Sequence, residues 1–555
     1  MPLCKRAAET IMSKLPSPRL LPIPPLCLAL LACASAPQIQ SGIPAITQPQ
    51  LHPHVRLPDI RRPEGETPAW WYRAGAVTAA TQGSMEGRAK NLILFVGDGM
   101  SLTTVTAARI LAGQRLGQSG EEYRLSWEEV PHTALSRTYN IDLQTPDSAG
   151  TMSAMATGVK TRAGVISVDQ SMWKGDCTGL AEGQRLTLWE LAAEAGLQTG
   201  VVSTTRLTHA TPGATLAHVP ERNWESDANL PDEAAWLGCI DIARQMIHSP
   251  YGVGPKVLMG GGRANFMPKD QADPEYPALR GKRLDGRDLI AEWRIRYPTG
   301  RYVWNSAQLA AAPDDAPLLG LFEPDHMQWA DQRDTGPGGE PSLAEMTRAA
   351  ITRLGNAGNG FVLLVEGGRI DHGNHAGNAF RALNETIAMS EAVDVARQMT
   401  SVEDTLILVT ADHSHTLSLV GYPGRGNPVL GTVAHRDRNG ERVLALDDNG
   451  LPYTSLSYAN GPGYRGPGPR PDLTEIDTSA PDYLQEALVP MIGESHGGDD
   501  VGLWASGPGS AAIRGSIEQN VIFHFLLQAH PQLRAFACQR DGCSPEGVPV
   551  ELPRP

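Results

Sequence analysis

The chain has 555 residues, of which 41% are hydrophobic, and its formal net charge is −14. This acidic balance, without a Lys/Arg-rich patch, argues against a nucleic-acid-binding module. An anionic substrate would therefore need local positive charge, which bound metal ions could supply. The length fits about three to four average domains or one large α/β domain.

The first segment has the features of an export signal. Basic residues from Lys5 to Arg19 precede an apolar stretch over residues 20–32, which is too short to span a membrane. We therefore predict a signal peptide over residues 1–33, with translation starting at Met1 or Met12.

The end of this signal is compatible with more than one kind of processing. The letters LLAC at residues 30–33 resemble a bacterial lipobox and predict a lipid on Cys33. Cleavage after the letters ASA at 34–36 is the alternative, and a chance apolar N-terminus is another. We expect a periplasmic or cell-surface lipoprotein, in the outer membrane of a bacterium that has one, or otherwise a secreted protein. Membrane contact would be through the lipid only, since residues 551–555 carry no hydrophobic tail.

A linker and a helical arm are expected next. Residues 34–67 are rich in Pro, Gln and Ile with little periodicity, which indicates a linker. Residues 68–85 form a predicted N-terminal arm helix that carries Trp70 and Trp71. Two adjacent tryptophans on a short helix indicate packing either on a second subunit or on the chain's own domain.

Continuous apolar runs alternate with helical patterns through the rest of the chain. Such runs are typical of strands buried on both faces of a parallel sheet. The alternation predicts an α/β fold, with a large, mostly parallel central sheet flanked by helices on both faces. The predicted strands cover residues 91–96, 199–203, 256–259, 360–365, 405–409 and 501–505. The clearest helical patterns cover residues 186–195, 343–354 and 379–399.

Residues 421–493 break this alternation. They are rich in Gly, Pro, Asp and Asn, with short strands at best, and they predict an inserted subdomain.

Potential metal ligands follow several of the predicted strands. In an open α/β sheet, sites lie beyond the C-terminal ends of the strands. Carboxylates with imidazoles suit zinc, whereas carboxylates with a hydroxyl suit magnesium. A single Asp-His pair after a strand is more often a structural hydrogen-bonding pair. Several strand ends that each carry such residues would bury unpaired carboxylates, which costs much free energy. The candidates are Asp98, His209, Thr211, Glu366, Asp371, His375, Asp412, His413 and His496.

A serine at a predicted helix start completes this pattern. The letters TPDSAGT at residues 145–151 read as a turn into a helix, with Ser148 near its beginning. The dipole and free N–H groups there favour an anion. Ser148 alone would be interpreted as an N-cap; beside metal ligands it becomes a candidate nucleophile.

These segments resemble the alkaline phosphatase family. The resemblance runs from about Pro68 to about Cys543 and includes LILFVGDGM, TPDSAGT, HATPGATLAHVPERNW, VEGGRIDHGNH, VTADHSHT and ESHGGDDV. The motifs resemble those of the animal enzymes more than those of the shorter bacterial ones. It implies a catalytic domain over residues 86–545, a crown in place of the insertion at about 421–493, and a C-terminal tail over 546–555. It also implies a homodimer that hydrolyses phosphate monoesters through a phosphoserine.

The resemblance assigns roles to the candidate ligands. It implies one zinc held by Asp371, His375 and His496, and a second held by Asp98, Asp412 and His413. It also implies a magnesium ion held by Asp98, Thr211 and Glu366. The other implied roles are the nucleophile Ser148, the phosphate-binding Arg222, and His209 and His372 behind the metal ligands.

A calcium ion is implied less directly. Glu275, Glu323 and the backbone carbonyl of Phe322 match the family's calcium ligands. Glu340 stands where the family carries an aspartate, and a glycine-rich stretch over residues 336–339 precedes it.

Four cysteines follow the signal region: Cys177, Cys239, Cys538 and Cys543. An even number in an exported chain suggests two disulfides, and spacing alone favours only Cys538 with Cys543. Four buried free thiols are the alternative. The resemblance implies the pairs Cys177–Cys239 and Cys538–Cys543.

Two other functions stay open from the sequence. One is a sister activity on the same scaffold, such as a phosphodiesterase, sulfatase or phosphonate hydrolase. The other is a catalytically silent, metal-bound surface protein, against which the presence of Ser148 and Arg222 argues.

Overall fold

Strand β1 (Asn91–Gly97) is buried on both faces, and the main sheet is arranged around it. Leu92 and Leu94 pack into one hydrophobic core, whereas Ile93 and Phe95 pack into another, because successive side chains of a strand point to opposite faces. The computed structural model describes residues 65–356 and 358–554. The predicted signal peptide, Cys33 and most of the predicted linker lie outside the described residues.

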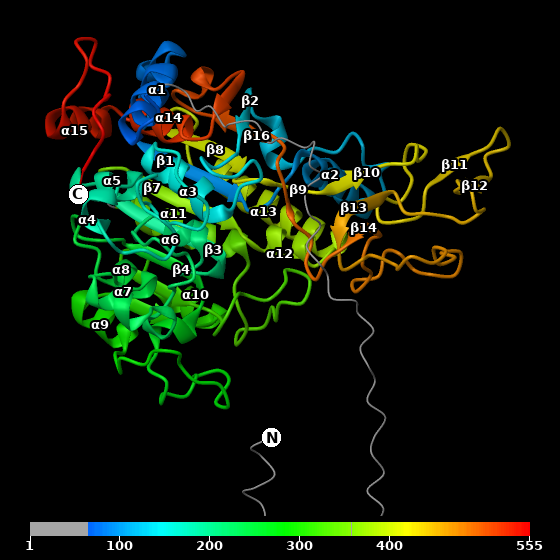
Figure 1. Cartoon of the computed structure of the whole chain (residues 1–555), viewed down its shortest axis with the longest axis horizontal. Coiled ribbons are helices and arrows are strands. Elements are labelled where there is room, and N and C mark those ends of the chain that lie inside the picture. The colour runs from blue at the N-terminus through cyan, green and yellow to red at the C-terminus, as the bar shows by residue number, and fades with distance from the viewer. Residues whose placement is uncertain (1–64, 357, 555) are drawn as a thin grey trace, which may run out of the picture. The chain divides into compact units, whose positions relative to one another are not determined.

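The main sheet has ten strands in the order β17-β2-β16-β8-β1-β7-β3-β4-β6-β5. Seven consecutive strands, from β8 to β5, run parallel, and β16 is antiparallel to both of its neighbours. The predicted, mostly parallel sheet is therefore confirmed (Figure 1). The strands are β1, β2 (His132–Arg137), β3 (Gln198–Arg206), β4 (Val257–Gly261), β5 (Arg301–Val303), β6 (Leu318–Leu321), β7 (Phe361–Gly367), β8 (Thr405–Ala411), β16 (Val501–Ser506) and β17 (Ser516–Glu518).

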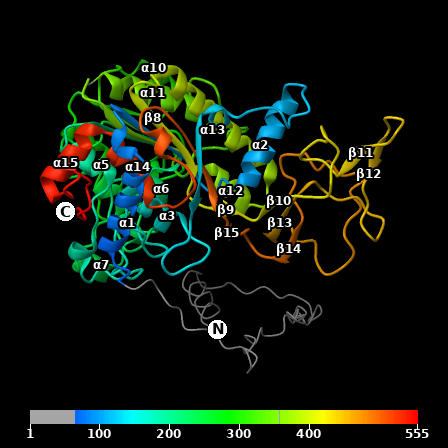
Figure 2. The ribbon, with the colours of Figure 1, turned by 90° about the horizontal axis from the view of Figure 1, so that it is seen from above.

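Helices cover both faces of this sheet, as predicted. Helices α1, α3, α5 and α14 lie on one face, and α2, α11 and α13 lie on the other (Figure 2). Their buried residues belong to two separate hydrophobic clusters, one for each face. The helices are α1 (Pro68–Thr81), α2 (Leu102–Arg115), α3 (Ser148–Thr157), α4 (Leu180–Gly183), α5 (Leu188–Glu194), α6 (Ala210–Gly213), α7 (Asp232–Trp236), α8 (Ile242–Ile247), α9 (Leu289–Arg296), α10 (Ser306–Ala311), α11 (Leu343–Gly355), α12 (Arg369–His375), α13 (Ala379–Met399), α14 (Val521–Ala529) and α15 (Pro531–Asp541).

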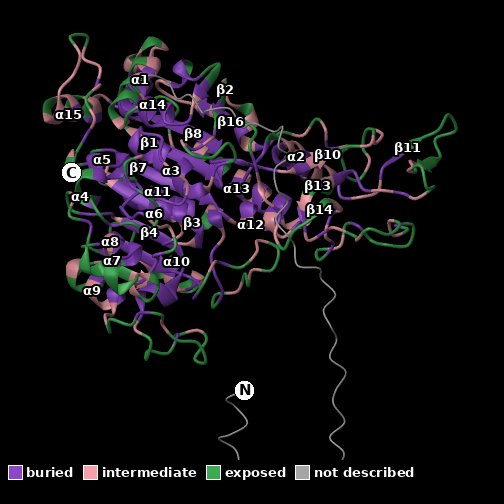
Figure 3. Cartoon of the chain, in the orientation of Figure 1, coloured by how far each residue is buried: buried purple, intermediate pink, exposed green. Residues whose placement is uncertain are grey.

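Residues 421–493, together with the strand just before them, form separate small sheets. β10, β13 and β14 make a three-stranded sheet, and β11 and β12 make a hairpin that projects from it (Figure 1). Exposed and half-buried residues dominate the hairpin, whereas the buried residues gather along the main sheet (Figure 3). The minor strands are β9 (Ser414–His415), β10 (Leu417–Leu419), β11 (Ala434–Arg436), β12 (Arg442–Leu444), β13 (Leu456–Gly461), β14 (Ala487–Pro490) and β15 (His496–Gly497).

The N-terminal helix α1 packs on its own chain. Trp71 and Tyr72 are buried, and Asn520 and Gln528 of the α14 region donate hydrogen bonds to backbone carbonyls of α1. Packing on the chain's own domain is therefore observed for Trp71, whereas Trp70 is exposed. The helix ends at Thr81, earlier than predicted, and a separate 3₁₀ turn follows it.

Both implied disulfides are present. Cys177 is joined to Cys239, and Cys538 is joined to Cys543.

Candidate functional site

The candidate metal ligands meet at one edge of the main sheet. Val96 of β1 stands opposite Glu366 of β7 and Thr410 of β8. Asp98 and Asp412 follow β1 and β8 directly, so parallel pairing brings their carboxylates to the carboxyl edge, as expected for a doubly wound sheet. The burial of both side chains is complete. This edge therefore gathers carboxylates that need cations or protons.

The first ligand cluster consists of Asp371, His375 and His496. Oδ1 of Asp371 lies 3.3 Å from Nε2 of His375 and 3.4 Å from Nε2 of His496. The two Nε2 atoms are 3.1 Å apart. Zinc–nitrogen bonds of about 2.0–2.1 Å place tetrahedral ligands roughly 3.3 Å from one another. The three atoms therefore have the spacing of a zinc site.

Helix α12 explains part of this convergence. Asp371 and His375 lie four residues apart on α12, so they share a face, as the sequence predicted. His496 comes from β15, far away in the sequence.

The second ligand cluster includes the candidate nucleophile. Nε2 of His413 lies 3.3 Å from Oδ1 of Asp98 and 3.3 Å from Oδ2 of Asp412. Oγ of Ser148 lies 3.1 Å from the same Nε2 and 3.3 Å from Oδ1 of Asp98. The same tetrahedral spacing applies, with Ser148 in the position of a further ligand.

Backbone carbonyls fix the tautomers of the ligating histidines. Nδ1 of His375, His413 and His496 faces the carbonyl oxygens of Glu494, Ser414 and Pro146, respectively. Each Nδ1 therefore carries the proton and donates it. Each Nε2 is left with a free lone pair directed into the clusters, which is the arrangement that orients a metal-binding imidazole.

Three buried oxygens beside the second cluster have no hydrogen bond of ordinary geometry within the described part of the chain, although Thr211 lies close enough to Glu366 to lower the pKa of its carboxyl group. They are Oδ2 of Asp98, Oγ1 of Thr211 and Oε1 of Glu366. Burial raises the pKa of Glu366 to about 7, although Ser203 donates a hydrogen bond to its other oxygen. Buried oxygens left unpaired are costly. A hard cation such as magnesium would satisfy all three at once.

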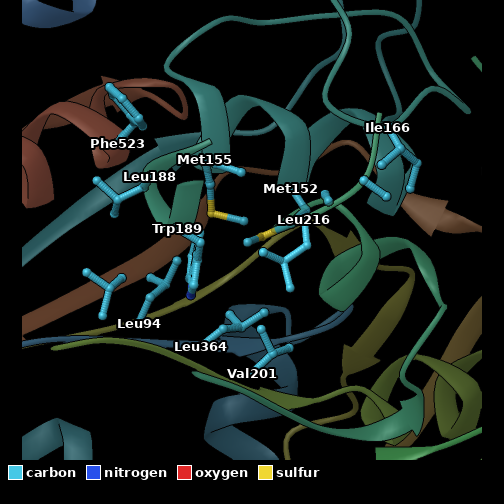
Figure 4. Packing of buried hydrophobic residues seen from close by; sticks show 14 of the residues in the cluster. Leu94, Met152, Met155, Ile166, Leu188, Trp189, Val201, Leu216, Leu364 and Phe523 are labelled. Carbon is cyan, nitrogen blue, oxygen red and sulfur yellow. The ribbon is translucent and has the colours of Figure 1, made fainter. Parts of the chain in front are cut away.

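Ser148 occupies the first position of α3, and its neighbour Asp147 is the N-cap. Oδ1 of Asp147 accepts the N–H of Gly150 at 3.1 Å. The interpretation of Ser148 as an N-cap is therefore wrong. Met152 and Met155 anchor the helix in the core against Trp189 (Figure 4).

Arg222 lies beside this helix start. Its Nη1 donates to Oδ2 of Asp147 at 2.9 Å, and its Nη2 lies 3.1 Å from Nε2 of His209. The guanidinium is thus oriented from two sides next to Ser148. It can present its remaining N–H groups to an oxyanion.

His209 and His372 lie behind the metal ligands, and a third histidine joins them. Their ring centroids are 5.7 Å apart, and the ring of His326 lies 4.3 Å from that of His372. A nitrogen of His209 also lies within 4.8 Å of oxygens of Asp98 and Glu366. His326 follows no predicted strand, so its position in the chain carries no signal for this role.

His415 is a residue that the sequence reasoning missed. Its Nε2 lies 2.7 Å from Oδ1 of Asp371, and its Nδ1 faces Oε2 of Glu494. Burial opposes a charge on His415, but the two carboxylates raise its pKa to about 10. Both ring nitrogens of His415 are thus engaged by carboxylate oxygens, so His415 positions Asp371. The His-x-His spacing with His413 was the available signal.

The implied calcium ligands form a looser group. Burial, followed by the charge of Glu323, raises the pKa of Glu340 to about 8, and Oε2 of Glu340 is buried without a partner within the described ranges. Glu275 pairs with Arg263 at 2.8 Å. Phe322 directly precedes Glu323 at the end of β6. The described clusters with ligand atoms within 4.8 Å of one another do not include these carboxylates.

Comparisons with known proteins agree with this geometry. The family model of alkaline phosphatase matches residues 89–531. Tissue-nonspecific alkaline phosphatase of Felis catus is 42% identical over 449 residues, covering 79% of this chain and 83% of that protein. The enzyme of Gallus gallus is 43% identical over 451 residues, with 80% and 84% covered. The crystal structure of Thermus thermophilus alkaline phosphatase superposes with a TM-score of 0.58 at 26% identity, covering 85% of this chain and 96% of that one.

Fold and clusters together define a metal-binding phosphatase, a hydrolase built on an α/β sheet. The chain belongs to the alkaline phosphatase family. In the described part of the chain, no helix combines the length and the hydrophobicity needed to cross a membrane.

Proposed function

We propose that this protein hydrolyses phosphate monoesters to an alcohol and inorganic phosphate through a phosphoserine at Ser148. The observation that carries the proposal is the position of Ser148 Oγ, 3.1 Å from His413 Nε2 and 3.3 Å from Asp98 Oδ1. A serine hydroxyl inside a cluster of metal-type ligands is a suitable nucleophile, because such surroundings favour its ionised form.

The donor atoms support two zinc ions and one magnesium ion. Asp371, His375 and His496 would hold one zinc, and Asp98, Asp412 and His413 would hold the other. Asp98, Thr211 and Glu366 would hold magnesium through oxygen alone. When bound, these ions supply positive charge for the phosphate oxygens and for the attacking and leaving oxygens.

The chain's own groups then carry out two displacements. Ser148 attacks phosphorus in line with the ester oxygen, and the phosphoryl group becomes attached to Oγ while the alcohol leaves. Arg222 donates two hydrogen bonds to phosphate oxygens, held in that orientation by Asp147. Water then attacks phosphorus from the side opposite Oγ and releases phosphate. Two inversions give net retention at phosphorus.

Metal analysis combined with rate measurements tests this function. Purified protein should contain zinc and magnesium and should hydrolyse p-nitrophenyl phosphate much faster than bis(p-nitrophenyl) phosphate or p-nitrophenyl sulfate. Faster diester or sulfate hydrolysis would establish a sister activity. No hydrolysis of any ester by metal-loaded protein would establish the catalytically silent alternative.

We also propose a calcium ion held by Glu275, Phe322, Glu323 and Glu340. The unpaired, buried oxygen of Glu340 supports it, because an oxygen-only site suits calcium.

A homodimer is proposed as the assembled form. An exposed apolar run supports it, because monomers rarely expose such patches. The run lies at and after β14 and includes Leu488, Val489, Met491 and Ile492.

Export with a lipid on Cys33 is proposed from the lipobox letters in the sequence. The protein would then act at the cell surface or in the periplasm.

A further inference from the structure

Two arginines without carboxylate partners lie beside the candidate catalytic centre. Arg369 begins α12, the helix that supplies Asp371 and His375, and Arg381 lies in the first turn of α13. Within the described residues, neither guanidinium forms an ion pair, and each has a buried Nε–H without an acceptor. The nearby Arg206, in contrast, pairs with Glu225 and Asp325.

Both arginines stack on Trp329. The centroid of its ring lies 3.7 Å from Cζ of Arg369 and 4.8 Å from Cζ of Arg381. Stacking occupies the face of a guanidinium and leaves its N–H edge free to donate hydrogen bonds. Trp329 thus holds two positive charges close together, and an anion bound to both would offset their repulsion.

The neighbouring carboxylates Asp325 and Glu385 contact other groups. Asp325 accepts a hydrogen bond from Arg206 at 2.7 Å. Glu385 accepts the N–H of Ala330 at 2.7 Å. Neither of these carboxylates forms an ion pair with Arg369 or Arg381.

The arginine pair is connected to the candidate phosphate site through two histidines. Nη1 of Arg369 lies 3.0 Å from Nδ1 of His372, whose ring centroid is 5.7 Å from that of His209. Nε2 of His209 lies 3.1 Å from Nη2 of Arg222. Because two imidazole rings separate Arg369 from Arg222, an anion on the arginine pair is a different group from the phosphate at Ser148.

The geometry points to a second anion subsite formed by Arg369, Arg381 and Trp329, which takes the distal phosphate of an organic bisphosphate. The proximal phosphate would be the one hydrolysed, so the inference rests on the proposed function and adds a substrate class to it. The intervening rings require a spacer of several bonds between the two phosphates. Inorganic diphosphate is too short to reach both positions.

Matched pairs of substrates test the subsite. Initial rates are measured for butane-1,4-diol, hexane-1,6-diol and octane-1,8-diol bisphosphates, each against the alkyl monophosphate of the same length. We expect kcat/KM per phosphate group for the best bisphosphate to exceed that of its monophosphate by about three- to ten-fold, as for one or two exposed ion pairs. The preference should depend on the length of the spacer.

Variants separate the subsite from the catalytic centre. Arg381→Gln should abolish the preference and leave kcat/KM for alkyl monophosphates unchanged, which also reports intact folding. Trp329→Ala should reduce the preference, because the ring holds both guanidiniums. Arg438→Gln is the control, since Arg438 is an exposed arginine in the turn between β11 and β12. It should keep the preference.

The possible outcomes are distinguishable. Hydrolysis of alkyl monophosphates without a preference for any bisphosphate would overturn the subsite and leave the proposed function standing. A preference that survives in Arg381→Gln would also overturn it. A chain that hydrolyses neither kind of ester would overturn the proposed function and the subsite together.

Discussion

Nε2 of His415 lies 2.7 Å from Oδ1 of Asp371, so a charged imidazole supports a candidate zinc ligand from behind. His415→Gln should weaken zinc binding by about 10- to 100-fold, the usual effect of removing a group that orients a metal ligand. Chelator competition at equilibrium measures this change. His435→Gln, at an exposed histidine of β11, is the control. Equal zinc affinity in both variants would show that Asp371 needs no such support.

Replacing Arg222 by lysine should impair catalysis. Lysine keeps the charge but cannot donate in the planar fork that both Asp147 and a phosphate require. We expect kcat/KM for p-nitrophenyl phosphate to fall by about 10- to 100-fold in Arg222→Lys, the equivalent of one charge-assisted hydrogen bond. Asp147→Asn should cause a smaller loss. Wild-type kinetics in Arg222→Lys would remove the argument for bidentate binding.

The free energy of unfolding should depend on pH through the ionisation of Glu340, and bound calcium should remove this dependence. The folded pKa of Glu340 is raised to about 8 by burial, followed by the charge of Glu323, whereas the unfolded value is about 4.3. The folded state therefore binds the proton more tightly, so stability is greatest below the unfolded pKa. It should be lost as pH rises from about 4 to about 8, by a few kcal/mol.

Denaturant unfolding with and without calcium measures this effect. Calcium should flatten the pH dependence in the wild type, and Glu340→Gln should flatten it without calcium. Glu403→Gln, at an exposed glutamate, should change nothing. An identical pH profile in calcium-free wild type and Glu340→Gln would contradict the assignment, as would zinc loss in Glu340→Gln.

The Cys177–Cys239 disulfide should contribute more stability than Cys538–Cys543. Its cysteines are 62 residues apart in the sequence, against 5 for the second pair, and a longer closed loop restricts the unfolded chain more. Replacing Cys177 and Cys239 by Ala should lower the melting temperature more than replacing Cys538 and Cys543. Both variants should retain activity. A larger loss from the short loop would show that chain entropy does not decide the difference.

Lipid on Cys33 would make the wild-type protein partition into detergent. Cys33→Ser should then remain in the aqueous phase, while Cys27→Ser, within the predicted signal, should partition as the wild type does. Aqueous partitioning of the wild type would argue for secretion without an anchor.

The main sheet could be predicted because its central strands are buried on both faces. A strand such as β1 has an apolar side chain at nearly every position, which gives a continuous run in the sequence. The missed strands β2, β5, β6 and β17 are short or lie near the ends of the sheet. In β2 exposed and buried residues alternate, so no continuous apolar run exists.

The ligands could be predicted because they directly follow strands or share a helix turn. Asp98 and Asp412 follow adjacent strands, and the parallel register brings them together. The positions of His415 and His326 depend instead on which side chains from distant segments fill the space behind the ligands. Glu494, which fixes His415, and Arg206, which contacts His326, come from such segments. Spacing in a single sequence does not reveal these contacts.

The phosphorylation state of Ser148 tests the central claim most directly. Ser148 lies at the first position of α3 among the ligands of the second cluster, so a phosphoryl group should become attached to its Oγ during turnover. Protein mixed with p-nitrophenyl phosphate at acidic pH and quenched in acid should yield a phosphorylated Ser148 peptide by mass spectrometry, and Ser148→Ala should lose that peptide and most activity. An unmodified Ser148 peptide during active turnover, or full activity in Ser148→Ala, would contradict the account.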